Sequence, residues 1–126
     1  MEDQTLADFA ALRASLGTQT LIIRGRGENV VRLDVVARDM GVRRLSGDLG
    51  MDGGSRARLA MIHLAEADVL AARQFMPDAP GLPSAGERVE LWGEAWQVRS
   101  VQRLGYARPG IIRLEITRNE SRRGGR

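Results

Sequence analysis

Residues 86–105, GERVELWGEAWQVRSVQRLG, decide the fold, because two short alternating runs meet there at Gly93-Glu94. Alternation of apolar and polar residues is typical of strands with one buried face. A glycine at the first position of a two-residue loop favours the type II′ turn of a β-hairpin. We therefore predict a hairpin of strands 87–92 and 95–103, with Gly93-Glu94 as its loop.

The pairing of this hairpin follows from counting outward from the loop. Two of the predicted pairs are apolar and share one face, whereas Glu90 and Gln97 form a polar pair on the other. A one-residue slip would exchange the faces, so this clean separation supports the register. The predicted pairs are Trp92 with Ala95, Leu91 with Trp96, Glu90 with Gln97, and Val89 with Val98. Trp96 is therefore predicted to lie in the core.

Trp92 falls on the polar face beside a small partner that leaves its ring uncovered. Two interpretations stay open. The N-terminal helix covers the indole in a second, minor core, or the indole stays exposed and anchors a partner protein, as tryptophan often does in interfaces.

The rest of the chain predicts a mainly β fold. Apolar residues at helical spacing indicate a short N-terminal helix over residues 3–16, ended by Gly17. Period-two runs and turn residues indicate further strands, and a short helical turn is expected at 66–75. The further strands are 19–24, 29–38, 56–64 and 110–118. We expect a helix (1–17), a small antiparallel β-barrel or sandwich of about six strands (18–118), and a basic flexible tail (119–126).

Two long connections interrupt the predicted barrel. Pro77, Pro80 and Pro83 exclude regular structure from 76–86. Residues 39–55 contain five glycines and no sustained period, which predicts a long inserted loop. This loop carries the main candidate contact residues, for a neighbouring ring or for phosphates; a solvated insertion is the alternative interpretation. The candidates are Val42, Arg43, Arg44 and Leu45.

The composition excludes much of the usual catalytic chemistry. The chain has no cysteine and no lysine, and His63 is its single histidine. Thiolate sites, Schiff bases and multi-histidine metal sites within one chain are thereby excluded. Asp48 and Asp52 lack the spacing of a calcium loop. We therefore expect neither an enzyme nor a metal or other cofactor, and no apolar run approaches the ~20 residues of a membrane span.

The net charge of +3 belongs to the C-terminus. Residues 118–126, RNESRRGGR, carry that surplus, whereas the rest of the chain is neutral. Such a tail is either a solvated end or a contact for DNA or an acidic partner surface. The candidate contacts there are Arg122, Arg123 and Arg126.

The hairpin and its flanks also carry a family resemblance. Its elements are a Gly–acidic start, an alternating strand, a Gly-Glu turn, an aromatic residue and a Val-x-x-Val strand. Weaker matches are the strand from Val31 to Asp39 before a Gly-containing loop, and the pair Arg122-Arg123. The hairpin elements stand as Gly86-Glu87, Val89, Leu91, Gly93-Glu94, Trp96, Val98 and Val101. In this pattern the chain resembles the head–tail joining proteins of long-tailed phages, the phage lambda type that closes the filled head.

The resemblance implies a virion protein that is made in the host cytoplasm and assembles into the neck. It implies a hexameric homo-oligomeric ring between portal-side adaptor proteins and the tail terminator or tail tube, with packaged DNA passing through its lumen. A tail terminator or adaptor ring of the same neck is an alternative. A small nucleic-acid-binding β-barrel is another, although the few aromatic residues and the neutral body fit base stacking poorly.

Overall fold

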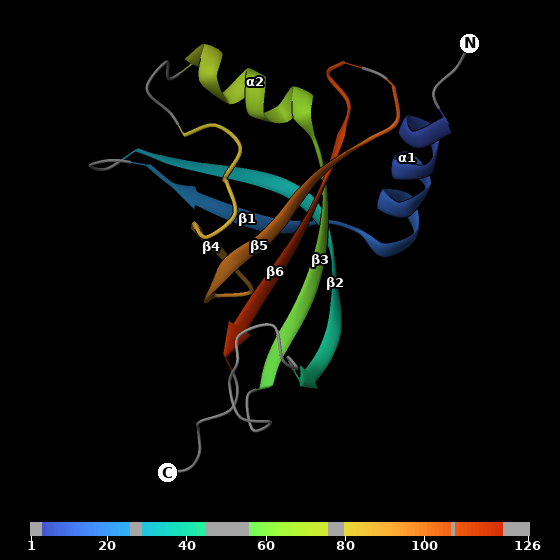
Figure 1. The fold of residues 1–126 in the computed structure, drawn as a ribbon. Coiled ribbons are helices and arrows are strands. Elements are labelled where there is room, and N and C mark those ends of the chain that lie inside the picture. Colours follow the sequence, from blue (N-terminus) through green and yellow to red (C-terminus); the bar gives the residue numbers. More distant parts are fainter. Residues whose placement is uncertain (1–3, 26–28, 45–55, 76–79, 107, 120–126) are drawn as a thin grey trace.

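The computed structural model describes residues 4–25, 29–44, 56–75, 80–106 and 108–119. Two helices and six strands follow one another along the chain (Figure 1). They are α1 (Gln4–Leu16), β1 (Gln19–Arg24), β2 (Val30–Arg44), β3 (Arg56–Ala65), α2 (Glu66–Phe75), β4 (Arg88–Leu91), β5 (Glu94–Leu104) and β6 (Ile111–Asn119).

The six strands form a closed antiparallel barrel in the order β1-β2-β3-β6-β5-β4. A barrel, rather than a sandwich, is thus the form of the predicted fold. Alternate residues of the strands point inward and fill the interior, as strand geometry requires. The largest fully buried side chains include Trp96, Leu21, Ile62, Leu64, Leu91, Leu114 and Ile116.

The β4–β5 hairpin exists, but its loop lies one residue earlier than predicted. Leu91 pairs with Glu94, so Trp92 and Gly93 form the loop. Both have positive φ, at 56° and 76°, which is the pattern of a type I′ turn rather than II′. The pairing therefore moves by two positions, and Val89 faces Trp96. Because the side-chain period is also two, the faces stay as predicted.

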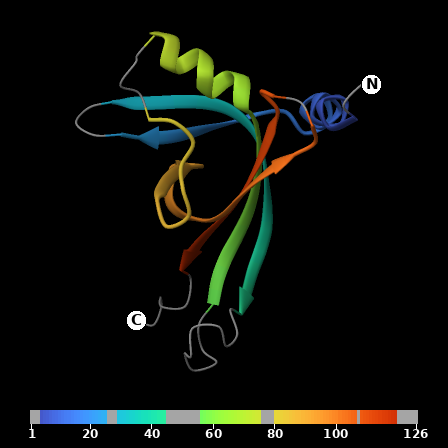
Figure 2. The same ribbon diagram turned by 45° about the horizontal axis from the view of Figure 1, so that its top comes forward.

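The predicted loop 39–55 is wrong in its first six residues, because β2 continues to Arg44. Residues 36–44 of β2 pair with β3, with a bulge between Asp39 and Gly41. Gly41 has φ 86°, and its amide donates to the Asp39 carboxylate at 2.8 Å, which accommodates the bulge. Figures 1 and 2 show the ends of β2 and β3 running together, and β6 accompanies β3 as far as the pair Ala57–Asn119. Residues 45–55 lie outside the described chain.

Helix α1 packs against the outside of the barrel through a small apolar cluster. Phe9 is buried together with Val36 of β2 and Ile111 of β6, and Leu12 packs against them. Gly17, with φ 75°, ends the helix and donates to the Arg13 carbonyl at 2.9 Å. This cluster does not contain Trp92, so the helix covers β2 and β6 rather than the hairpin corner.

Helix α2 lies across the end of the barrel away from the free ends of β2 and β3, and residues 80–87 run along its side toward β4 (Figure 2). Val69 of α2 is buried in the core, and Leu82 packs against it. The Glu66 carboxylate accepts two 2.7 Å hydrogen bonds from Arg103 of β5 and one of 3.2 Å from the Gly110 amide. These bonds hold the pKa of Glu66 below its ordinary value, Arg103 being the main cause.

Strands β1 and β4 close the barrel through only two residue pairs, Leu21 with Leu91 and Ile22 with Glu90. Across the seam, Arg24 donates to Glu90 at 2.5 Å, which lowers the pKa of that carboxyl. A cavity of about 650 Å³ lies beside this seam. It is lined by residues of β1 and β4 and by Pro80 and the residues next to it.

We expect Gly25→Ala to destabilise this seam. A Cβ on Gly25 would lie 3.0 Å from Pro80 Cδ, which is too close for ordinary packing. Such overpacking costs about 1–3 kcal/mol, partly offset by the reduced freedom of the unfolded chain. Urea denaturation of Gly25→Ala, Pro80→Ala and the double variant measures it. The crowding explanation requires that Pro80→Ala recover most of the loss; additive losses would contradict it.

Candidate docking surface at the hairpin end of the barrel

Trp92 occupies the corner of the β4–β5 hairpin, and its side chain is held in place although it is 40% exposed. Its Nε1 donates to Gln19 Oε1 at 3.2 Å. Its ring meets Trp96 edge to face, with 6.0 Å between centroids and 68° between planes. Of the two interpretations from the sequence, cover by the N-terminal helix is wrong and the indole is exposed, whereas its role as an anchor for a partner stays a prediction. A positive φ is unfavourable for a bulky residue, so these contacts must hold the turn.

Trp96 closes the barrel interior directly behind Trp92. It is 2% exposed, and its Nε1 donates to the Leu91 carbonyl at 3.1 Å. The guanidinium of Arg118 lies 5.2 Å from its ring centroid, a cation–π geometry. Arg118 also forms an ion pair with Glu94, the first residue of β5. The buried and the exposed indole thus form one edge-to-face pair, with the Arg118 guanidinium beside the buried ring.

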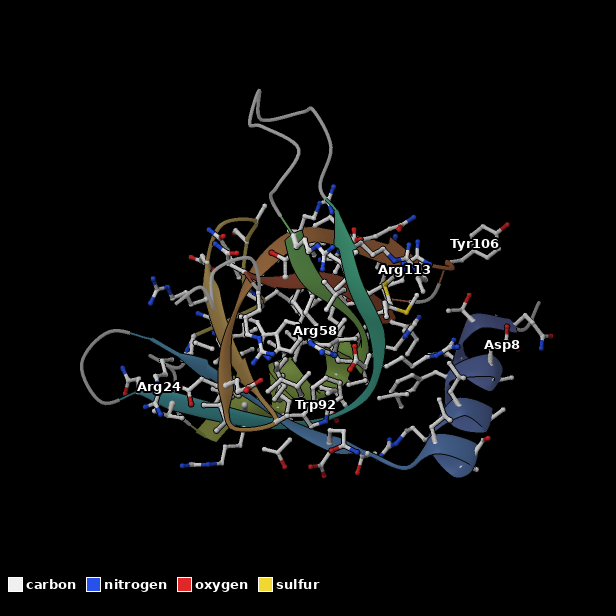
Figure 3. The ribbon with its side chains drawn as sticks, turned by 90° about the horizontal axis from the view of Figure 1, so that it is seen from below. Asp8, Arg24, Arg58, Trp92, Tyr106 and Arg113 are labelled. Carbon is white, nitrogen blue, oxygen red and sulfur yellow. The ribbon has the colours of Figure 1, made fainter. Side chains whose placement is uncertain are left out.

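Arg58 extends this surface across β3 to β2. It pairs in register with Arg118 on one side and with Val42 on the other. Its guanidinium forms a 2.6 Å ion pair with Asp39. Figure 3 looks at the barrel from this end and shows Arg58 and Trp92 over its opening, with α1 outside it. We call this surface the rim; it consists of Asp39, Val42, Arg58, Trp92, Glu94 and Arg118.

The structure brings only part of the predicted site together. Val42, 42% exposed, and Trp92 both belong to the rim, on opposite sides of the two arginines. Arg43 is exposed on β2 and pairs with Ala57, on the opposite face of the strand from Val42. Arg44 is the last residue of β2. Leu45, Arg122, Arg123 and Arg126 lie outside the described residues.

The sequence did not reveal the rim arginines. Arg118 looked like part of the basic tail, and Arg58 looked like the start of an apolar strand. Only the register, which joins residues 58 and 118 across two strands, puts them on one surface. Because each forms an ion pair with a carboxylate, the six rim residues together carry no net charge, and the pair Arg44–Arg56 lies two positions further along β2 and β3. Such a surface suits a protein partner better than a phosphate backbone.

His63 lies away from the rim, on the outer face of β3 under α1. It lines a cavity of about 400 Å³ together with Asp8, Phe9 and other residues. Its buried Nδ1 has no hydrogen-bond partner among the described residues. Burial, helped by Arg113 and Arg38, lowers the pKa of the imidazole. Within the described chain, no three histidine or acidic side chains are grouped as a metal site would need.

This environment predicts a pH dependence of stability. Since the folded chain binds the His63 proton more weakly, the unfolded chain takes it up first as the pH falls below about 6.5. The free energy of unfolding should then decrease, by at most about 1.4 kcal/mol per pH unit. Urea denaturation between pH 7.5 and 5.5 measures the slope. His63→Gln should flatten it, and an unchanged slope in that variant would exclude His63 as the cause.

Neither helix of the described chain is long and apolar enough to cross a membrane. Comparison of the chain with protein-family models, with curated proteins and with solved structures finds no match.

Proposed function

We propose that this chain is a structural virion protein of a long-tailed phage neck, where it forms a ring that closes the DNA-filled head and joins it to the tail. The observation that carries the proposal is Trp92. A large aromatic side chain is held at 40% exposure in a turn whose backbone disfavours it. Rigid, exposed aromatic residues at a corner are the usual anchors of protein interfaces.

The rest of the rim supports docking of proteins. The charges of Arg58 and Arg118 are balanced by Asp39 and Glu94, so the rim itself is polar without net charge. This composition suits an interface with a polar border and one apolar anchor. The proposed neighbours are further copies of the chain, a portal-side adaptor, and the tail terminator or tube protein.

A catalytic role has less support. The larger cavity lies at the β1–β4 seam, and Arg24 and Glu90, which line it, are bonded to each other. The cavity under α1 contains His63, and among the described residues no nucleophile lies in hydrogen-bond contact with it, as covalent catalysis would need. The proposal therefore treats the protein as an assembly component that needs no cofactor.

Co-sedimentation tests the proposal. A lysate of cells that produce the phage is separated on a density gradient, and each fraction is probed for this chain. The proposal requires it to travel with DNA-filled particles at a few copies each. Tailless and complete particles then distinguish a head-closing ring from a terminator or adaptor ring. A chain that stays at the top of the gradient, or follows free nucleic acid, contradicts the neck assignment; the latter favours a nucleic-acid-binding barrel.

A further inference from the structure

Two strands of the barrel are longer than one of the strands they pair with: β2 extends past β1, and β5 extends past β4. The β1–β2 pairing ends at Gln19 and Val35, so among the described residues positions 36–44 of β2 pair with β3 alone. Likewise, β4 pairs with residues 94–97 of β5, and Glu87 and Gly86 bond to Val98. Within the described chain, residues 100–104 of β5 then pair with β6 alone. We call these segments the β2 edge (37–44) and the β5 edge (100–104).

The two edges are complementary in direction. Neighbouring strands alternate across β2-β3-β6-β5, so β2 and β5 run in opposite directions. If a second copy in the same orientation lies beside the first, its β5 runs antiparallel to the first copy's β2. Their hydrogen bonds would continue the alternating antiparallel sheet from one copy into the next.

The side chains along the edges are complementary too. Each edge has an exposed valine on the face that also carries the core: Val42, 42% exposed, and Val101, 39% exposed. Val101 pairs with buried Leu114, and Val42 pairs with Arg58, which lies on the same face of β3 as buried Ala60. Exposed valines at two open strand edges form a natural cross-strand pair.

The register that places Val42 opposite Val101 also gives the residues beside them partners on the same face. With Val42 opposite Val101 of the next copy and the bulge accommodating Met40, Asp39 lies opposite Arg103, both on the core face. On the outer face, Arg43 lies opposite Ser100, whose hydroxyl bonds to Glu115 at 3.4 Å. This register contains one pair of opposite charges, Asp39 with Arg103, which within one chain pair with Arg58 and Glu66, and each facing pair shares a face.

We infer that the β2 edge of one copy binds the β5 edge of a second copy of this chain, head to tail. This inference rests on the proposed function, and it specifies how the ring is built. A contact between two different surfaces repeats from copy to copy, and it closes into a ring when the rotation allows.

Cysteine cross-linking tests this contact, since the natural chain has no cysteine. Val42→Cys and Val101→Cys are made singly and together. Within one chain the two positions are on the order of 15–20 Å apart, from three strand spacings and about four residues, so an internal disulfide cannot form. Circular dichroism confirms that each variant is folded before it is oxidised at high protein concentration.

A mixture of the two single variants should give dimers with one chain of each kind, and the double variant should give a ladder of higher oligomers. Val42→Cys mixed with Tyr106→Cys, a position that is 84% exposed, controls for random collision. The expected pair should cross-link at least about tenfold faster than this control. Equal rates, or dimers of Val42→Cys with itself, overturn the inference.

The two proposals fail separately. Specific cross-linking of a chain that never sediments with phage particles would keep the head-to-tail contact and remove the neck assignment. A chain that sediments with particles but shows no specific cross-linking would keep the neck assignment and place the ring contact elsewhere.

Discussion

Trp96→Ala should lower the free energy of unfolding by about 3–5 kcal/mol, the range for deleting a large aromatic side chain from a core. Trp96 is 2% exposed and closes the hairpin end of the barrel. Its loss would remove the support under Trp92 and the ring beneath the Arg118 guanidinium. For a domain of ordinary stability, about 5–15 kcal/mol, this is a large fraction. Urea denaturation followed by circular dichroism measures it.

Trp96→Phe is the matched variant. It keeps an apolar ring in place but removes the indole N–H that donates to the Leu91 carbonyl at 3.1 Å. We expect a loss of about 1–2 kcal/mol, because that carbonyl then lacks its indole donor and a small space opens. If Trp96→Ala cost no more than Trp96→Phe, packing of the indole would not be what holds this end of the barrel together.

The faces of the hairpin could be predicted from the sequence although its register could not. The predicted loop at Gly93-Glu94 and the observed loop at Trp92-Gly93 differ by one residue at the corner, so each cross-strand pair moves by two. Side chains alternate between the two faces with a period of two, so a shift by two positions leaves each residue on the same face. The apolar residues therefore face the core in either register. The choice of turn depends on Trp92 adopting a positive φ, which local preferences disfavour and tertiary contacts stabilise.

The length of β2 could not be predicted for a related reason. Gly41 looks like a strand breaker, but a glycine with positive φ is what a bulge within a strand can use. The pairing that keeps residues 39–44 extended comes from β3, after a connection that includes residues 45–55. Likewise, Arg58 and Arg118 belong to one surface only because β3 and β6 pair in this register. Of the candidate docking surface, the exposed Trp92 could be predicted from the sequence, whereas its charged border could not.

A substitution of Trp92 should separate an effect on the stability of the fold from an effect on assembly. Trp92→Asn should leave the free energy of unfolding within about 1 kcal/mol of the natural chain. The substitution loses an aromatic contact worth about 0.5–1.5 kcal/mol and the exposed hydrogen bond to Gln19. It gains a residue that suits the first position of a type I′ turn, which relieves backbone strain of about 1 kcal/mol or more. The two effects nearly cancel, and urea denaturation checks the balance.

Assembly should respond quite differently to the same substitution. Removing an aromatic anchor from an interface typically costs at least about 2 kcal/mol, so Trp92→Asn should bind its partners about 30-fold more weakly. The measurement is incorporation: phage lacking the natural gene are supplied with natural or Trp92→Asn protein, and filled particles are assayed for the chain. Arg32→Gln, at an exposed position on β2 away from the rim, is the control for a neutral surface change. A docking role for Trp92 requires that the Trp92→Asn protein is stable but fails to enter particles. Normal incorporation of this variant would mean that the exposed indole is not the anchor.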